Sequence, residues 1–296
     1  LERNNLLINF DHWRFKRKWC WNYALAVAHG GSVPSMCILL AVIGGGNMAR
    51  AIIDGAIRGG IIQSDQIAVA DPDAISRAHF EELGCVVVES AAMLPKATYV
   101  LLAVKPQIFK SVASVVRGGV LYSIMAGVTT ESIAEATGNS TVVRIMPNLP
   151  CSVGMGAAGI ALGSSACDED AVLAMQLFNE IGVAVLVEES LMDAVTAVSG
   201  SGPAYVFMLA EAMIAGGVRS GLSLDVATTL VQQTVAGAAT LMDCDSRTPS
   251  ELREAVTSKG GTTAAALETM NERGVPEAIE DAVISARDRA RELGNN

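Results

Sequence analysis

Between residues 37 and 188, short continuous apolar runs alternate with amphipathic segments. Continuous apolar runs are typical of strands covered on both faces, as in a parallel sheet, and amphipathic segments joined to them by short connections predict helices that pack on those faces. We therefore predict an α/β fold with a doubly wound parallel sheet. The expected strands are residues 37–44, 66–71, 85–89, 97–104, 120–127, 141–146, 157–162 and 183–188. The expected helices are residues 48–60, 74–84, 107–116 and 130–138, and one more before the last strand that Asp168 could cap.

From residue 189 to the end, helical periodicity replaces this alternation and no segment reads as a convincing strand. Residues 191–218 are apolar on most sides, so we expect them to be buried in the core of this chain or of a partner. Pro203 predicts a break or kink there, and Gly200 and Gly202 allow close backbone approach. Such helices carry more apolar surface than one small bundle covers. We therefore expect a dimer in which helices of two chains share one core.

Composition narrows the possible partners and compartments. A net charge of −10 disfavours nucleic acid, because phosphate binding needs a basic surface. No uninterrupted apolar run is long enough to cross a bilayer, and the richest helix, around residues 204–218, carries Glu211, so no membrane partner is expected. The six cysteines are scattered without a CxxC pair. They indicate structural thiols in a reducing compartment, the cytoplasm, with no disulfide framework and no metal site.

Residues 1–35 differ from the rest of the chain. They hold all three tryptophans, and five basic residues against two acidic ones. Met36 then precedes the first apolar run. We predict an upstream extension that is disordered in the mature protein. The alternative is a targeting segment, in which RFKRKW would be the basic part and CWNYALAVA the apolar part, although Asn22 interrupts that short stretch.

The sequence VIGGGNMA carries a dinucleotide-binding pattern. Gly44, Gly46 and Ala49 have the G-x-G-x-x-G/A spacing, after an expected strand and at the start of an expected helix. The first glycine makes the tight turn, the second lets the backbone approach a pyrophosphate, and the small third residue lets helix and strand pack closely. The N-terminus of the helix favours the negative charge. The alternative is a glycine turn that binds nothing.

Other candidate cofactor contacts end the neighbouring strands. Asp71 ends the second strand, where an acid can hydrogen-bond a ribose 2′-OH and repel a 2′-phosphate, which favours NADH over NADPH. Asp71 could equally cap the next helix, since DPDA would also begin one. LAVKPQ and MAGVT end later strands and reach the carboxyl edge of the sheet, where ligands of this fold bind. Lys105 there is either a solvated lysine or a group near the cofactor's charge.

Six segments, VIGGGNMA, LAVKPQ, AGVT, RIMPNLP, DAVTAVSGSGPAY and VTSKGGTT, follow one another between residue 36 and about residue 293. In these segments the chain resembles the pyrroline-5-carboxylate reductase family, and the last two are far more specific than the glycine pattern. The resemblance implies a Rossmann domain at residues 36–188 and an all-α dimerisation domain at residues 189–296, with dimers that often assemble into decamers. The cofactor site implied by the pattern and the resemblance comprises Ile43, Gly44, Gly45, Gly46, Asn47, Met48, Asp71, Ser90, Ala103, Val104, Lys105, Pro106, Ala126 and Asn148.

The resemblance also gives VTSKGGTT a role, because the matching loop of the family binds the carboxylate of a cyclic imine. Glycines expose backbone donors, and the N-terminus of a helix starting at about Thr262 favours an anion. From the residues alone, a capped turn between two helices would explain the stretch as well. The resemblance further implies that Thr263 hydrogen-bonds the ring nitrogen and that Glu189 lies close to the substrate. The implied carboxylate donors are the hydroxyl of Ser258 and the N–H groups of Gly260, Gly261 and Thr262.

The implied reaction is the NAD(P)H-dependent reduction of 1-pyrroline-5-carboxylate to L-proline, by hydride transfer to the imine carbon. The cofactor carries the chemistry, while the protein orients the two reactants and supplies charge. A cyclic imine is basic enough to arrive protonated, so a threonine hydroxyl suffices and no strong general acid is needed. His79, the only histidine after Met36, is expected on the surface of a Rossmann helix.

Three positions depart from the family pattern. Lys259 stands where proline is usual, which makes the loop less rigid or adds a positive charge for the carboxylate. Leu149 replaces a threonine beside Asn148, which weakens the case for polar contacts there. Asp71 and Pro72 stand where many members have an Asn-Arg pair that suits NADPH, which again favours NADH.

Two other functions compete with this one. A reductase of the β-hydroxyacid dehydrogenase type would need a catalytic lysine on a helix of the second domain, whereas Lys259, the only lysine after Glu189, falls in a loop. A regulator that binds NAD(P)H without turnover would not need the intact SKGGTT loop.

Overall fold

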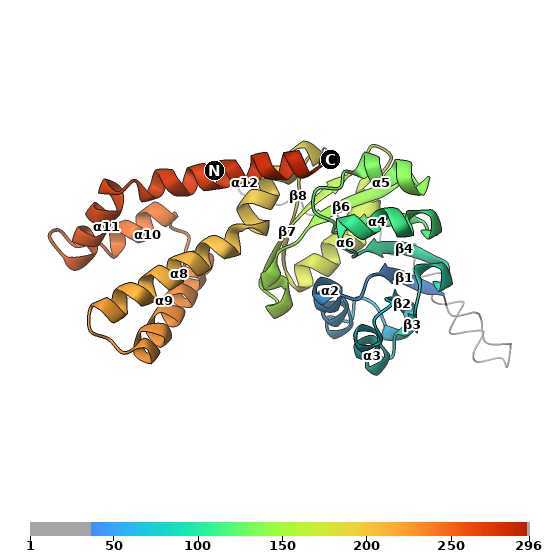
Figure 1. Ribbon diagram of the computed structural model, residues 1–296, viewed down its shortest axis with the longest axis horizontal. Helices are drawn as coiled ribbons and strands as arrows, with labels where there is room; N and C mark the ends of the chain where they lie inside the picture. Colours follow the sequence, from blue (N-terminus) through green and yellow to red (C-terminus); the bar gives the residue numbers. More distant parts are fainter. Residues whose placement is uncertain (1–36, 295–296) are drawn as a thin grey trace.

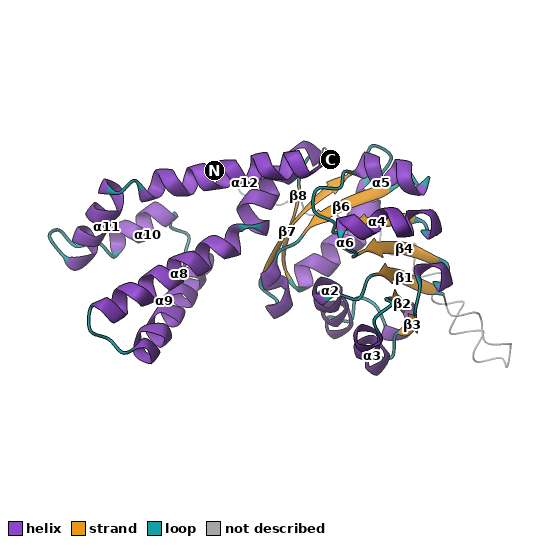
Figure 2. Ribbon diagram, viewed as in Figure 1, coloured by secondary structure: helices purple, strands orange, loops and turns teal. Residues whose placement is uncertain are grey.

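The computed structural model describes residues 37–294. These residues form a half built on a β-sheet, followed by a helical half that extends away from it (Figure 1). Figure 2 shows that every strand lies in the first half. The predicted N-terminal extension, residues 1–35, and its alternative as a targeting segment lie outside the described residues.

The eight strands form one sheet in the order β3-β2-β1-β4-β5-β6-β7-β8. All neighbouring pairs are parallel except β6 and β7. This exception has a simple cause: β6 and β7 are joined by a short 3₁₀ segment, Leu149–Val153, and a parallel pair would need a longer crossover. The strands are β1 Ile38–Ile43, β2 Ile67–Ala70, β3 Val86–Val88, β4 Ala97–Leu102, β5 Val120–Ser123, β6 Val142–Met146, β7 Gly156–Leu162 and β8 Gly182–Leu186.

Helices cover both faces of the sheet, so its central strands are buried on both sides. Along β1, Leu40 and Val42 belong to one apolar cluster, whereas Ala41 and Ile43 belong to another on the opposite face. Burial on both sides explains the continuous apolar runs and confirms the predicted doubly wound fold. The helices of this half are α2 Asn47–Arg58, α3 Ala74–Glu82, α4 Pro106–Val112, α5 Thr130–Thr137 and α6 Asp168–Glu180.

Some local predictions for this half differ from the structure. Cys167, not Asp168, is the N-cap of α6: its N–H donates to Asp170 Oδ2 at 2.9 Å. His79 is half-buried rather than free on the surface, with Nε2 2.9 Å from Asp54 Oδ1 on α2. The predicted helix at 107–116 ends early as α4, and a 3₁₀ turn, Ala113–Val115, completes it.

The second half is entirely helical in the described residues, as predicted. A π-helical segment, Thr196–Gly200, separates α7 from α8, and Pro203 lies in the first turn of α8, where its missing N–H is tolerated. A Cβ at Gly200 would lie 2.8 Å from Met146 Cε, but nothing of this chain lies near Gly202, so only Gly200 makes the predicted close approach. The helices are α7 Met192–Val195, α8 Gly202–Arg219, α9 Leu224–Cys244, α10 Pro249–Ala255, α11 Thr262–Glu272 and α12 Val275–Gly294.

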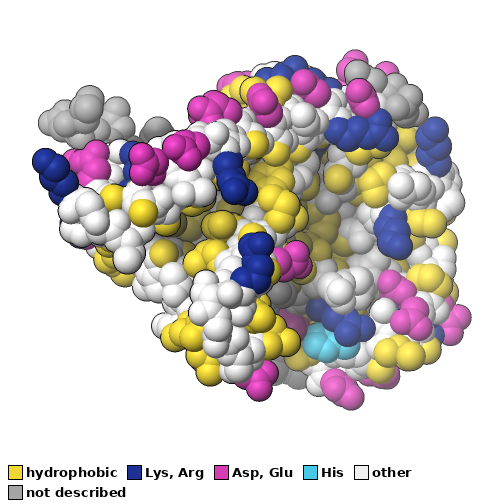
Figure 3. All heavy atoms as spheres, turned by 60° about the vertical axis from the view of Figure 1, so that its left-hand side comes forward, with side chains coloured by type: hydrophobic (Ala, Val, Ile, Leu, Met, Phe, Trp, Pro, Cys, Tyr) yellow, Lys and Arg dark blue, Asp and Glu magenta, His cyan; other side chains and the backbone are white. Residues whose placement is uncertain are grey.

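The apolar side chains of this half are largely uncovered. None of the residues of α8 is buried, and Figure 3 shows hydrophobic side chains gathered on this side of the molecule. Within the described residues, the continuous helical segment Glu189–Arg219 is long and apolar enough to cross a membrane by length and composition alone. A helix that packs against a second copy of the chain has the same properties, so this segment does not by itself indicate a membrane.

Candidate active site

The register of the sheet brings three of the predicted cofactor segments together. Ile43, the last residue of β1, pairs with Ala70 of β2 on one side and with Leu102 of β4 on the other. The residues that follow these strands therefore lie at the same edge of the sheet. Gly44 N–H donates to Ala70 O, and Ala103 N–H donates to Ile43 O, both at 2.9 Å.

Two glycines of the β1–α2 loop have different reasons for being glycine. Gly44 has φ +101°, and a Cβ there would lie 2.7 Å from the carbonyl oxygen of Ala103. Gly46 has ordinary backbone angles, and nothing in the described chain lies within 4 Å of a Cβ built on it. The fold therefore demands a glycine at 44, while position 46 keeps the loop open on the side where a ligand would approach.

The start of α2 offers backbone donors to such a ligand. Its N-cap is Gly46, which supplies no side chain, and the first turn carries no acidic residue. The N–H groups of Asn47 and Met48 have no acceptor among the described residues, because helix donors in the first turn have no partner within the helix. Ala49 is fully buried, so α2 lies close against the sheet. An open loop, free N–H groups and a helix N-terminus fit a dinucleotide pyrophosphate.

Asp71 faces this loop. Its Oδ2 accepts the N–H of Gly45 at 2.6 Å, and its Oδ1 accepts the N–H of Asp73 at 2.8 Å. The alternative that Asp71 caps the following helix is wrong, because Asp73 caps α3. Asp71 therefore holds the glycine loop and lies at the end of β2, where a ribose would bind.

The other predicted cofactor residues surround the same edge. Lys105 is the N-cap of α4 and Pro106 is its first residue, so Ala103, Val104, Lys105 and Pro106 form the β4–α4 connection. Ser90 caps a 3₁₀ turn after β3, with its hydroxyl 3.4 Å from the N–H of Ala92. Ala126 is exposed in the turn after β5.

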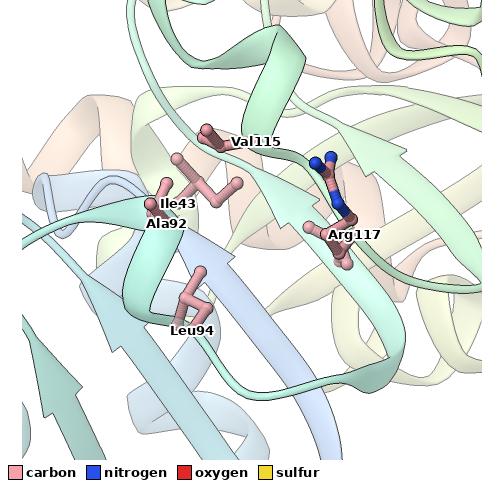
Figure 4. Close-up of a pocket in the computed structure, with 7 residues that line it drawn as sticks. Ile43, Ala92, Leu94, Val115 and Arg117 are labelled. Atoms are coloured by element: carbon pink, nitrogen blue, oxygen red, sulfur yellow. The ribbon is translucent and has the colours of Figure 1, made fainter.

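The side chains of Ile43 and Asn148 face the interior of the protein. Ile43 points into a small, partly open cavity of ≈ 30 Å³ that is also lined by Val100 of β4, Leu94 and Arg117 (Figure 4). That volume holds little more than a water molecule. Asn148 Nδ2 donates to Ser199 O at 3.0 Å, and its Oδ1 accepts the N–H of Ala157 at 2.9 Å. For both residues, the predicted cofactor contact therefore falls to the backbone.

Glu189 connects the two halves of the molecule. Its carboxylate accepts the N–H of Thr130 at 2.7 Å and also the Thr130 hydroxyl, at the start of α5. Its Oε1 lies 3.6 Å from Nη1 of the buried Arg144. Glu189 and Arg144 line a cleft of ≈ 420 Å³ beside Gly127, the neighbour of Ala126. Glu189 thus lies near the predicted cofactor edge, but its oxygens are already engaged.

The predicted substrate loop has the geometry of an anion-binding turn. Gly260 has φ +70°, and Ser258 Oγ would lie 2.3 Å from a Cβ at Gly261. Helix α11 begins at Thr262, as predicted, and Gly261 caps it without a side-chain hydrogen bond. The N–H of Gly261 donates to Ser258 O at 3.0 Å, so it closes the turn. The N–H groups of Gly260 and Thr262 have no acceptor in the described chain, and Thr263 is half-buried one residue further on.

Within one chain, however, the two predicted sites are far apart. Figure 1 shows α10 and α11, which flank the substrate loop, at the end of the molecule opposite to α2, α3 and the cofactor edge. The structure brings the cofactor residues together with one another, and the loop residues with one another, but not the two groups.

The sequence analysis assigned no role to three charged residues that the structure places near these sites. Arg144 lies in the middle of an apolar strand, which is a signal for a buried ion pair, and its Nη2 is 3.9 Å from Asp193 Oδ1. Asp73 and Arg77 both contact Asp71: the N–H of Asp73 donates to its carboxylate, and Arg77 Nη1 donates to its backbone oxygen. The Asp-Pro-Asp spacing left open which of the two acids caps α3, and Asp73 does.

Two family models match the chain on either side of its midpoint. A model described as pyrroline-5-carboxylate reductase dimerisation matches residues 189–293. A model described as NADP oxidoreductase, coenzyme F420-dependent, matches residues 39–127. The first lies in the helical half and the second covers the glycine loop and β4.

Curated relatives extend over nearly the whole described chain. A pyrroline-5-carboxylate reductase of Pisum sativum is 38% identical over 260 residues, which are 86% of this chain and 95% of that protein. One of Methanosarcina acetivorans is 39% identical over 263 residues, 86% of this chain and 97% of that protein. Both alignments pair almost all of the relative with this chain.

Solved structures agree with the sequence relatives. A pyrroline-5-carboxylate reductase of Coxiella burnetii has a TM-score of 0.80 and 32% identity, covering 88% of this chain and 99% of that one. A pyrroline carboxylate reductase of Plasmodium falciparum with NADP bound has a TM-score of 0.76 and 27% identity, covering 88% and 100%. By sequence along nearly its whole described length, and by fold, the chain belongs to the pyrroline-5-carboxylate reductase family.

Proposed function

We propose that the protein reduces 1-pyrroline-5-carboxylate to L-proline with NADH or NADPH. The observation that carries this proposal is the alignment of the whole described chain, both halves included, with reductases named for that substrate. A relative that shared only the glycine loop would support no more than a dinucleotide site.

The cofactor pyrophosphate is held at Gly46 and the first turn of α2, where free N–H groups meet its charge. When bound, the reduced nicotinamide supplies the hydride that goes to the imine carbon of the ring. The β4–α4 connection, Ala126 and the backbone at Asn148 border the nicotinamide end of the site. Arg144 and Glu189 hold the start of α5, and therefore the turn carrying Ala126, in place.

The substrate carboxylate is bound by the loop of residues 258–263, and that loop comes from a second copy of the chain. The loop is remote from the cofactor edge of its own chain (Figure 1). The helices that carry it expose apolar side chains that a second copy would cover. A dimer with shared helices therefore completes each site with one half from either chain. We further propose that such dimers assemble into a decamer with closed symmetry.

In this arrangement Thr263 lies near the ring nitrogen. The protonated imine carries a positive charge, which a threonine oxygen stabilises by accepting its N–H. Binding fixes the imine carbon next to the reduced ring, and this orientation is the main contribution of the protein. We also place the reaction in the cytoplasm, because the scattered cysteines of the chain fit a reducing compartment.

We also propose that NADH is preferred. The Asp71 carboxylate is fixed at the end of β2 by the N–H groups of Gly45 and Asp73. There it accepts a hydrogen bond from the ribose 2′-OH of NADH, whereas it repels the 2′-phosphate of NADPH. The comparison of kcat/KM for the two cofactors tests this, and a higher value with NADPH would contradict it.

The first test follows absorbance at the nicotinamide band with purified protein, either cofactor and 1-pyrroline-5-carboxylate. Substrate-dependent oxidation is expected. A non-catalytic regulator would bind the cofactor without oxidising it, and a reductase of the β-hydroxyacid dehydrogenase type would turn over a hydroxyacid instead.

A second test addresses the shared site. Gly46→Asp places a negative charge against the pyrophosphate, and Thr263→Val removes the hydroxyl at the ring nitrogen, so each variant alone is expected to retain about a tenth of the wild-type activity or less. Co-expression of both gives mixed dimers, in which one of the two sites has two intact halves. About a quarter of the wild-type activity should then return, because half of the dimers are mixed. No recovery would mean that each chain builds its site alone.

A further inference from the structure

The cofactor corner contains a second acid besides Asp71. Asp73 follows two residues later, and its N–H is bound directly to the Asp71 carboxylate at 2.8 Å. Its own carboxylate lies at the N-terminus of α3, where it accepts the N–H and the hydroxyl of Ser76, both at 3.0 Å, and the N–H of Ile75 at 3.3 Å. The ribose-binding acid and the cap of α3 are therefore neighbours.

Asp73 stays ionised at neutral pH. The hydroxyl and N–H of Ser76 lower the pKa of its carboxyl, and the nearby guanidinium of Arg77 lowers it further. The donors at this helix N-terminus, which would otherwise favour an added phosphate, are thus occupied by a built-in carboxylate. Between the two acids, Pro72 has no N–H to offer.

Arg77 is the cation of this corner, and it is already engaged. Its Nη1 donates to the backbone oxygens of Asp71 and Pro72 at 2.8 and 2.9 Å, and its Nη2 lies 3.4 Å from Glu89 Oε1. The corner therefore holds three carboxylates, those of Asp71, Asp73 and Glu89, and one guanidinium, so its net charge is negative.

Building on the proposed function, we propose that Asp73 is a second specificity-determining residue, whose carboxylate at the start of α3 acts with Asp71 to exclude the 2′-phosphate of NADPH. Discrimination is then shared: Asp71 selects the ribose diol by a hydrogen bond, whereas Asp73 acts only by charge. Replacing Asp71 alone leaves the second carboxylate in place, so it gives an incomplete switch.

The test measures dissociation constants of NAD⁺ and NADP⁺ for the full-length protein by calorimetry. Asp73→Asn keeps an oxygen that can cap α3 and removes only the charge. We expect NADP⁺ to bind about three- to tenfold more tightly and NAD⁺ to bind unchanged, with the gain shrinking at high salt because the group is exposed. Asp71→Asn should weaken NAD⁺, and the double variant should bind NADP⁺ more tightly than either single variant.

Two controls separate this role from a general effect. Asp168→Asn removes an equal charge from the first turn of α6, away from the corner, and should leave both constants unchanged. Arg77→Gln should weaken NADP⁺ more than NAD⁺, because it deepens the negative potential. Asp73→Asn with an unaltered ratio of the two constants, or with NAD⁺ and NADP⁺ tightened equally, overturns the inference. Failure of the wild-type protein to bind either nucleotide would instead contradict the proposed function.

Discussion

Two helices, one from each half, show how differently the halves of this molecule bury their residues. Helix α2, in the sheet half, buries five of its 12 residues against the sheet and neighbouring helices. Helix α8, in the other half, is 18 residues long and buries none. Phe207 and Met208 of α8 are 55% and 66% exposed. The sheet half covers most of its own apolar residues, whereas the helical half leaves most of them exposed.

This difference separates two kinds of site. The cofactor edge is formed by strand ends whose positions the sheet register fixes within one chain. The loop that would bind the substrate is carried by helices that need a further surface before their apolar side chains are covered. Assembly should therefore matter little for cofactor binding and greatly for turnover.

The largest effect is expected from Met208→Glu. A carboxylate buried without a partner costs several kcal/mol, which is about three orders of magnitude in the association constant. The variant should be monomeric by light scattering and lose at least about a thousandfold of kcat/KM, while NADH binding persists. Met93→Glu is the matched control, because it introduces the same carboxylate at a methionine of the sheet half that is 61% exposed. This variant should keep the oligomeric state of the wild type. A monomer with wild-type activity would contradict the claim that turnover requires a second copy of the chain.

Next come two substitutions within the cofactor edge. Gly44→Ala forces a side chain onto φ +101° and against Ala103 O, so it should lower the free energy of unfolding by at least about 1–3 kcal/mol and abolish NADH binding. Gly46→Ala meets nothing in the described chain, so it should leave the melting temperature unchanged and weaken NADH binding alone. Thermal unfolding and calorimetry of both variants would separate the fold requirement from the ligand requirement. An equally large drop in melting temperature for both would contradict that separation.

The sequence predicts the sheet half well because its signals are local. Each strand is a continuous apolar run and each connection is short, so the pattern contains the order of elements. The antiparallel β7 was not predicted, because strand direction depends on whether a connection crosses over, and an apolar run looks the same either way. A neighbouring residue provides the cap expected of Asp168 and the cap that was one of two alternatives for Asp71, because several acids or thiols within three residues can reach the same N–H groups.

The candidate site was also predicted only where its signals are local in the sequence. The glycine loop could be placed from spacing alone, since its neighbours in space follow from the Rossmann strand order. The interaction of Glu189 with Thr130 and Arg144 joins positions distant in the chain, and no periodicity encodes it. The substrate loop was found only through the family resemblance, because its residues also suit an ordinary turn between helices.

A smaller effect is expected at the substrate loop. Thr263→Val removes the oxygen near the charged ring nitrogen, and a hydrogen bond to a charged group is worth about 1.5–3 kcal/mol, so kcat/KM should fall about ten- to a hundredfold with the dimer intact. Thr262→Val is the matched control, because the adjacent residue contributes its backbone N–H rather than its hydroxyl. Steady-state kinetics with saturating NADH would compare them. Equal losses in the two variants would assign the effect to the start of α11 instead of to one hydroxyl.

The smallest effect should come from Lys259, exposed in the middle of the same loop. If its charge helps to hold the substrate carboxylate, Lys259→Gln should raise the substrate KM about two- to fivefold, the range of an exposed ion pair, and added salt should erase the difference. Lys259→Pro removes the same charge but stiffens the loop, which lowers the entropy lost on binding. An unchanged KM in both Lys259→Pro and Lys259→Gln would rule out a helpful charge. A raised KM in Lys259→Gln with an unchanged or lower KM in Lys259→Pro would mean that rigidity has compensated for the lost charge. Because the loop belongs to the half that needs a second copy, both variants must be compared at protein concentrations where light scattering finds the assembled form.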